Sequence, residues 1–167
     1  MSPRGQNAPA GPGAGLAAMR DEQGVMMASV SNNQPNRMLT GGCLCGAVRY
    51  IVSDAFQYAM NCHCSNCRRA TGSAFKPFAG LPRELLSIIE GESETMRYGS
   101  SANFDMHCRH CGSLLYSVVR DRTYVHVAMG TLLDEPSLRP SMHIFVGSSA
   151  PWHTITDDLP QHLEFPD

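Results

Sequence analysis

GGCLCGAVRY, residues 41–50, places two cysteines one residue apart between glycines and then continues into a β-branched and aromatic segment. The other five cysteines lie downstream, in NCHCSNC (residues 61–67) and in HCRHC (residues 107–111), so all seven fall into three short clusters. Clustered cysteines are typical of metal sites, whereas independent buried thiols are scattered along a chain. The clusters therefore predict at least one bound metal ion, and zinc is the metal we expect.

The number of cysteines divides them between two sites, because a structural zinc takes four ligands and a reactive zinc takes three and keeps one position open. Cys108 and Cys111 have zinc-knuckle spacing and are followed by Gly112. Cys43 and Cys45 supply a second pair more than sixty residues earlier. Joining the pairs would close a long loop, where a cross-link removes much chain entropy. We expect these four cysteines to hold a structural zinc.

Cys62, Cys64 and Cys67 are left as a triplet with no further cysteine to complete a tetrahedron. The fourth position of their zinc is therefore predicted to be open to a water, a thiolate or a carbonyl oxygen, which is typical of a catalytic zinc. Arg68 and Arg69 follow directly, and their charge would favour thiolates or hold a ligand carboxylate. We expect this triplet to be the catalytic site.

Two alternatives for the metal chemistry remain at this stage. A histidine could supply the missing ligand and close the second site; the candidates are His63, His107, His110, His126 and His143. His126 alternates with valines in a strand-like run, which favours a structural histidine. An iron–sulfur cluster is the other alternative, although neither ferredoxin spacing is present.

The composition describes a single domain that has few features of a nucleic-acid or membrane protein. The chain has 167 residues, 43% of them hydrophobic, which is enough for one core. Its formal charge is −2, and seven thiolates binding two Zn²⁺ would bring this to about −5, which argues against nucleic acid as a partner. No apolar run is long enough for a membrane span, and no signal peptide is visible. An odd number of reduced thiols suits the cytoplasm, which is the predicted location.

Residues 1–37 differ from the rest of the chain, because they are rich in Gly, Ala, Pro, Asn and Ser and lack hydrophobic periodicity. We expect a disordered tail or a wrongly assigned start of translation, with Met26, Met27 and Met38 as alternative starts. The zinc-binding domain is then predicted to span residues 38–167.

Short strand-like runs separated by Gly, Pro, Asn and Asp follow from Thr40 onward. The predicted strands are 47–52, 74–79, 87–90, 94–98, 103–107, 114–119, 124–129 and 143–146. A short helical piece is predicted over residues 83–89, after Pro82. This pattern predicts a mainly β fold of short, curled antiparallel sheets whose modest core is supplemented by zinc.

Four motifs together resemble one known family: GGCLCGAVRY, NCHCSNCRRATGSAF, HCRHCGSLLY and HIFVGSSAPW. They are similar to successive motifs of the glutathione-dependent formaldehyde-activating enzyme and centromere protein V family, the GFA family, from about Thr40 to Leu159. The resemblance implies a β fold of several coiled sheets and two zinc sites. It also implies a structural site at Cys43, Cys45, Cys108 and Cys111 and a catalytic site at Cys62, Cys64 and Cys67.

The resemblance further implies a carbon–sulfur lyase that forms S-(hydroxymethyl)glutathione from formaldehyde and glutathione. A thiolate at the triplet would add to the aldehyde carbon, and His63 or Tyr98 would donate the proton. CRRATGSAF (residues 67–75) is similar to a short-chain branch of the family, so the thiol and aldehyde stay open. A non-catalytic zinc-stabilised module that binds a protein partner is the alternative function.

Side chains outside the cysteine clusters are expected to have mainly structural roles. The aromatic residues near the motifs are expected mainly in the core, with Trp152 kept as a possible pocket wall; they are Phe75, Phe78, Phe145 and Trp152. Asp157 and Asp158 are expected to be solvated turn residues.

Overall fold

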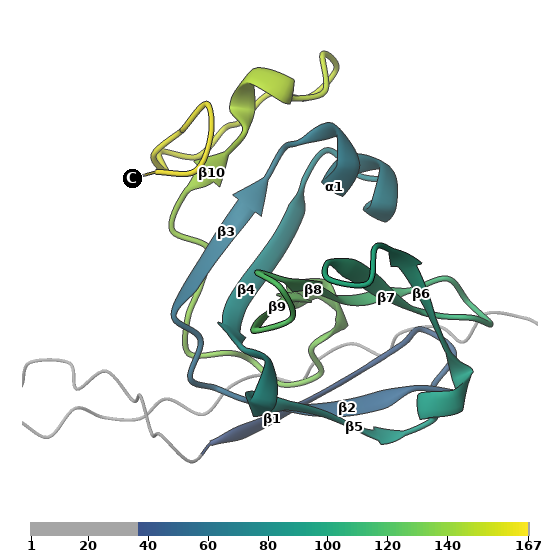
Figure 1. The fold of residues 1–167 in the computed structure, drawn as a ribbon. Coiled ribbons are helices and arrows are strands. Elements are labelled where there is room, and N and C mark those ends of the chain that lie inside the picture. The colour runs from purple at the N-terminus through teal and green to yellow at the C-terminus, as the bar shows by residue number, and fades with distance from the viewer. Residues whose placement is uncertain (1–36, 167) are drawn as a thin grey trace, which may run out of the picture. The chain divides into compact units, whose positions relative to one another are not determined.

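The computed structural model describes residues 37–166, which form two β-sheets and one α-helix (Figure 1). The expectations for residues 1–36 lie outside this range. Arg37 belongs to the folded part, because its guanidinium pairs with the Asp54 carboxylate at 3.0 Å. The smaller sheet is antiparallel and has the strand order β1-β2-β5. Its strands are β1 (Met38–Gly42), β2 (Arg49–Ser53) and β5 (Leu86–Glu90).

The larger sheet has seven strands in the order β10-β3-β4-β9-β8-β7-β6. All neighbouring strands in it are antiparallel except β10 and β3, which are parallel. Its strands are β3 (Tyr58–Cys62), β4 (Lys76–Pro82), β6 (Thr95–Gly99), β7 (Phe104–Cys108), β8 (Leu114–Val119), β9 (Tyr124–Ala128) and β10 (His143–Ile144).

Helix α1 (Ser65–Thr71) follows β3 directly and faces the β6–β8 side of the larger sheet in Figure 1. The other helical elements are single 3₁₀ turns: η1 (Arg83–Leu85), η2 (Glu92–Glu94), η3 (Met129–Thr131) and η4 (Val146–Ser148). Within the described range, no helix is long and apolar enough to cross a lipid bilayer.

The main core lies where side chains of the two sheets meet. Tyr50 of β2 and Tyr116 of β8 are both fully buried, and their rings meet edge to face with 6.4 Å between centroids. Burial of a large apolar side chain contributes roughly 1.5–3 kcal/mol each. Contacts of this kind pack the two sheets against each other, and Cys43 and Cys108, beside the ends of β1 and β7, belong to the same buried cluster.

The prediction of a mainly β fold is confirmed, and the structure shows which predictions of individual elements were wrong. All eight predicted strands are present within a few residues, and that over 114–119 has the predicted bounds. The helical piece over 83–89 is wrong, because η1 ends after one turn and Leu86, buried at 2% exposure, enters β5 beside β2. Strands β1 and β3 and helix α1 were not predicted.

Candidate metal centres and the adjoining cavity

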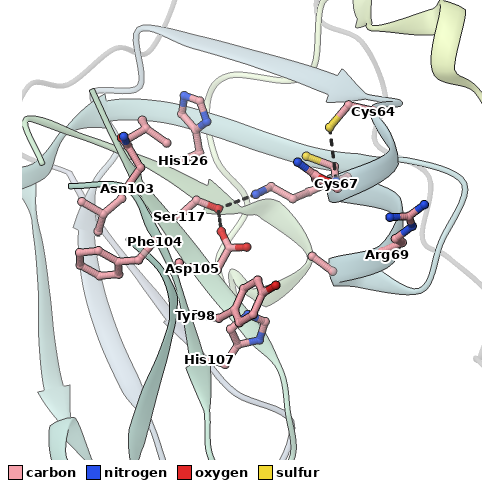
Figure 2. Close-up of a pocket in the computed structure, with 16 residues that line it drawn as sticks. Cys64, Cys67, Arg69, Tyr98, Asn103, Phe104, Asp105, His107, Ser117 and His126 are labelled. Carbon is pink, nitrogen blue, oxygen red and sulfur yellow. Dashed lines mark hydrogen bonds between the residues drawn. The ribbon is translucent and has the colours of Figure 1, made fainter. Parts of the chain in front are cut away.

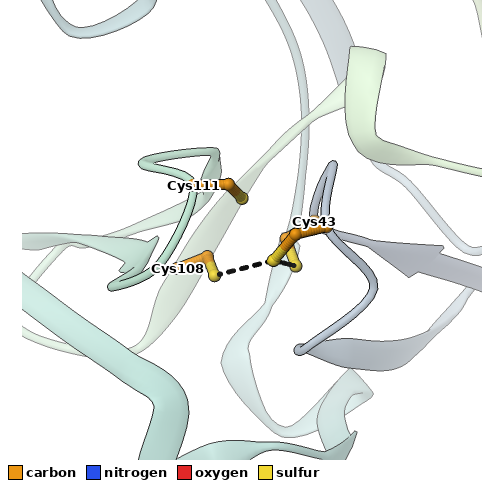
Figure 3. A group of neighbouring side chains, drawn as sticks. Cys43, Cys108 and Cys111 are labelled. Carbon is orange, nitrogen blue, oxygen red and sulfur yellow. Dashed lines mark hydrogen bonds between the residues drawn. The ribbon is translucent and has the colours of Figure 1, made fainter. Parts of the chain in front are cut away.

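Four cysteines from distant parts of the chain meet between the two sheets (Figure 3). Cys43 and Cys45 lie in the loop after β1, Cys108 ends β7, and Cys111 lies in the turn before β8. All four Sγ atoms lie within 4.8 Å of one another. We call this group the quartet, and it connects the smaller sheet to the larger one.

The quartet has the dimensions of a tetrahedral thiolate site. Four sulfurs at the usual Zn–S distance of about 2.3 Å would be separated by about 3.8 Å from one another. The Cys43 and Cys45 sulfurs are 3.5 Å apart, and those of Cys45 and Cys108 are 3.8 Å apart. The Val48 backbone N–H donates to Cys43 Sγ at 3.3 Å, a contact that stabilises a ligating thiolate. The residues present therefore fit a zinc ion.

Both turns of the quartet depend on glycine. The amides of Gly46 and Gly112 donate to the carbonyls of Cys43 and Cys108, at 3.1 and 2.9 Å. The two glycines have φ values of 79° and 76°, in the left-handed region that side chains disfavour. These paired turns direct the cysteines of each arm toward one point.

Cys62, Cys64 and Cys67 form the second group, which we call the triplet. Cys62 ends β3, Cys64 caps the N-terminus of α1, and Cys67 lies in its first turn. The three Sγ atoms lie within 4.8 Å of one another, and the Cys67 amide donates to Cys64 Sγ at 3.4 Å. Hydrogen bonds from Cys62 and Cys67 lower the pKa of the Cys64 thiol, which favours its thiolate form.

Within residues 37–166, no histidine or carboxylate joins either cysteine group. The triplet thus offers three sulfur ligands, which is the donor set of a zinc site with one position left for another ligand. The alternative in which a histidine closes the second site has no support in this arrangement. The assignment of the triplet as catalytic remains a prediction.

His63 lies between two triplet cysteines in the sequence but bonds in another direction. Its Nε2 is 2.7 Å from His143 Nδ1, and His143 Nε2 is 3.1 Å from the Asp157 carboxylate. Because a carboxylate only accepts, His143 donates to Asp157 and accepts from His63. Burial lowers the pKa of His63 to about 4, which keeps its ring neutral. Asp157 is exposed in a bend, as expected, and its carboxylate also accepts the hydrogen bond that orients His143.

The remaining candidate histidines have partners of their own. His126 accepts from or donates to the Tyr58 hydroxyl at 2.9 Å and stacks on Phe78 with 4.2 Å between ring centroids. Burial lowers the pKa of His126 to about 3, which agrees with the expected structural role. His107 Nδ1 is 3.2 Å from the Gly112 carbonyl, and His110 contacts the Glu94 carboxylate at 2.5 Å.

A cavity of about 670 Å³ adjoins the triplet (Figure 2). Cys64 and Cys67 line one side of it, together with Arg69 of α1. Strands β6 to β9 supply the opposite side, where Tyr98 lies at 75% exposure and His126 is also present. The cavity therefore gives a small molecule access to two of the three triplet sulfurs.

Lys76, Ser117 and Asp105 form a polar chain in this cavity that the sequence did not reveal. Lys76 is 3% exposed, and its ammonium donates to Ser117 Oγ at 2.7 Å. Ser117 Oγ in turn donates to Asp105 Oδ1, as the dashed lines in Figure 2 show. The available signal was that Lys76 is the single lysine of the chain and lies in the apolar stretch AFKPFAG.

The other predicted residues divide between the cavity and its surroundings. Tyr98 lines the cavity, whereas His63 is not among its lining residues, so Tyr98 is the better placed of the two proposed donors. Arg68 turns away to donate to the His63 carbonyl at 3.3 Å.

The four aromatic residues near the motifs do not share one environment. Phe78 is a core residue at 2% exposure, as expected. Phe75 and Phe145 are half-buried. Trp152, expected as a possible pocket wall, is 72% exposed and is not among the residues that line the cavity beside the triplet.

Comparison with known proteins shows which family the sequence of this chain matches. The model of the glutathione-dependent formaldehyde-activating enzyme family, GFA, matches residues 38–148. This chain belongs to the GFA family. A crystal structure of a Rhodobacter sphaeroides protein is also similar, with 27% identity and a TM-score of 0.50, over 58% of this chain and 90% of that one.

The GFA match begins at the first residue of β1 and includes every cysteine of the quartet and the triplet. Family membership supports a GFA-like function, which the family name links to glutathione and formaldehyde. Both cysteine groups can hold metal ions.

Proposed function

We propose that this chain is a zinc-dependent carbon–sulfur lyase that catalyses the reversible addition of a thiol to a small aldehyde. The observation that carries the proposal is the triplet, whose three sulfurs gather beside a cavity with no fourth protein ligand in the described range. Glutathione and formaldehyde are the first pair to consider, because the GFA family is named for them. The quartet would hold a second zinc that stabilises the fold.

The donor set suits such a reaction. Zinc held by Cys62, Cys64 and Cys67 would supply a Lewis acid that lowers the pKa of a thiol at its fourth position. The chain itself supplies the room and the orientation, because the cavity reaches Cys64 and Cys67 and is large enough for part of a tripeptide thiol.

Charged and polar side chains around the cavity suit an anionic thiol. Arg69 is exposed at its rim and can form a charge-assisted pair with a substrate carboxylate. Tyr98, on the opposite rim, offers a hydroxyl donor. A cavity with converging polar groups favours the enzyme over the alternative of a non-catalytic protein-binding module. Thiolate ligands must stay reduced, so the proposal also favours the cytoplasm.

Exchange spectroscopy tests the proposal directly. NMR exchange between free glutathione and S-(hydroxymethyl)glutathione is measured with formaldehyde, with and without zinc-loaded protein. The expected result is faster exchange with the wild type and the uncatalysed rate with Cys64→Ser, since the serine variant loses a triplet ligand. Unchanged exchange with the wild type would reject this pair of substrates. Repeating the measurement with cysteine and 2-mercaptoethanol shows whether the peptide part of glutathione is required.

A further inference from the structure

Lys76 has an environment unlike that of any other cation in the described residues. It is the single lysine of the chain and begins β4 at 3% exposure. The arginines nearest the triplet, Arg68 and Arg69, are more exposed. Because a buried ammonium loses much hydration, a lysine in such a place requires compensation from its surroundings.

The compensation visible in the fold is incomplete. An ammonium has three N–H donors; the contact with Ser117 uses one of them, and the Phe78 ring, 5.9 Å from Nζ, adds a weak cation–π contact that uses no hydrogen-bond partner. Within residues 37–166, Lys76 forms no ion pair, and Asp105 reaches it only through Ser117. The ammonium therefore keeps donors and net positive charge available to a ligand in the cavity that it lines.

The register of the sheet places Lys76 beside the triplet. Lys76 is the direct cross-strand partner of Cys62 in the antiparallel β3–β4 pair, so both side chains lie on the same face. Lys76 and Cys67 also line the same cavity. A carbonyl group that reacts with a thiolate at the triplet would place its oxygen, one bond from the attacked carbon, in the cavity that Lys76 also lines.

We propose that the Lys76 ammonium is a catalytic hydrogen-bond donor that stabilises the aldehyde oxygen while the thiol adds, an inference that rests on the proposed function. The thiol first releases its proton to solvent. Its sulfur then bonds to the carbonyl carbon, and the π electron pair of the C=O bond moves to oxygen. The alkoxide so formed accepts a hydrogen bond from Lys76 and takes a proton from solvent to give the hydroxymethyl thioether.

Ser117 and Asp105 are positioning residues in this scheme. Ser117 Oγ accepts a hydrogen bond from Lys76 and donates one to Asp105, so the hydroxyl holds the ammonium in one position in the cavity. A donor fixed in advance and shielded from water stabilises developing charge more than a mobile one does. Truncation of Ser117 to alanine is expected to lower kcat while leaving the KM for the thiol unchanged.

The first test uses the wild-type protein and needs no activity. Because Lys76 is the single lysine, ¹⁵N-lysine labelling gives one side-chain ammonium resonance. Formate serves as the probe, since it is a one-carbon anion with the size of formaldehyde. The expected result is a saturable shift of this resonance in zinc-loaded protein. A resonance that does not respond to formate would overturn the assignment.

The second test compares Lys76→Met, which keeps the apolar stem, with Lys76→Arg, which keeps the charge. Removing such a donor typically lowers kcat about 10²- to 10³-fold. We expect this loss in the Met variant, with zinc content and glutathione affinity unchanged, and partial recovery in the Arg variant. If the wild type catalyses exchange and the rate of the Met variant is within about threefold of the wild-type rate, the role assigned to Lys76 is wrong. Lack of exchange in the wild type would instead reject the proposed function.

Borohydride trapping distinguishes hydrogen bonding from covalent chemistry. If Lys76 condensed with the aldehyde, reduction would attach a methyl group to its amine, and mass spectrometry would find it on that residue. The proposal predicts that no such adduct forms at the rate at which the thiol adds to the aldehyde. A stoichiometric adduct that forms at the rate of turnover would overturn it.

Discussion

The quartet and the triplet use the same ligand chemistry in opposite structural settings. The quartet joins residues 63 positions apart, between the loop after β1 and the end of β7. The triplet lies within one local stretch, at the junction of β3 and α1. A metal in the quartet would therefore cross-link the two sheets, whereas a metal in the triplet would constrain a single turn. Because the ligand type is the same, we infer a stabilising role for the quartet and a reactive role for the triplet from their positions in the fold.

Their surroundings differ in the same sense. The quartet combines the buried Cys43 and Cys108 with the exposed Cys45, and the Val48 amide and Ser113 contact its sulfurs. In the triplet, Cys64 and Cys67 border the 670 Å³ cavity that also contains Lys76. The quartet is thus held mainly by contacts within the fold, and the triplet faces the space where a substrate would bind.

Serine substitutions in the two groups provide the largest expected contrast. Cys108→Ser should lower the free energy of unfolding by several kcal/mol, because structural zinc binding is coupled to folding. Cys64→Ser should leave the protein folded and abolish exchange activity. Urea unfolding followed by circular dichroism, together with zinc analysis, measures both effects. Similar unfolding midpoints for the two variants would break the distinction between the groups.

A smaller effect concerns the stability of the cavity side of the fold in acid, and it depends on His126. Burial lowers the pKa of His126, beside the cavity, to about 3. Below pH 6.5 the unfolded chain binds a proton at this ring that the folded chain does not. Stability that is present above pH 6.5 is therefore lost as the pH falls toward 3, by at most about 1.4 kcal/mol per pH unit.

A glutamine variant isolates this effect. His126→Gln should flatten the fall in unfolding free energy between pH 6.5 and 5, because its amide does not titrate there. Urea titrations at several pH values measure the slopes. Equal slopes for wild type and His126→Gln would contradict the role assigned to burial.

Six of the seven strands of the larger sheet, all except β3, could be predicted from sequence because their signals are local. Strand β8, for example, is a mainly apolar run, interrupted by Ser117, whose residues are nearly all buried. Helix α1 was missed because none of its residues is buried, so it lacks hydrophobic periodicity. Its visible signals were the glycine at its C-terminal end, Gly72, and the triplet itself. The wrong helix over 83–89 arose from a leucine-rich pattern that pairing with β2 overrides.

The cysteines of the candidate site were recognisable from spacing alone, but their polar neighbours were not. Lys76, Asp105 and Ser117 belong to three different strands, and the fold of the larger sheet is what brings them into one cavity. The same holds for His63, His143 and Asp157, which meet only because β10 pairs with β3. Such contacts depend on tertiary structure, and no pattern in a single sequence encodes them locally.

Zinc release to a colorimetric chelator tests the division between quartet and triplet most directly. Zinc-loaded wild type is mixed with an excess of 4-(2-pyridylazo)resorcinol, and release is followed with time. The expected result is two phases of equal amplitude, a fast one from the triplet, which has three ligands and borders the cavity, and a slow one from the four-ligand quartet, with the fast phase missing in Cys64→Ser. A single phase that releases all the zinc, or a fast phase that persists in Cys64→Ser, would contradict the division.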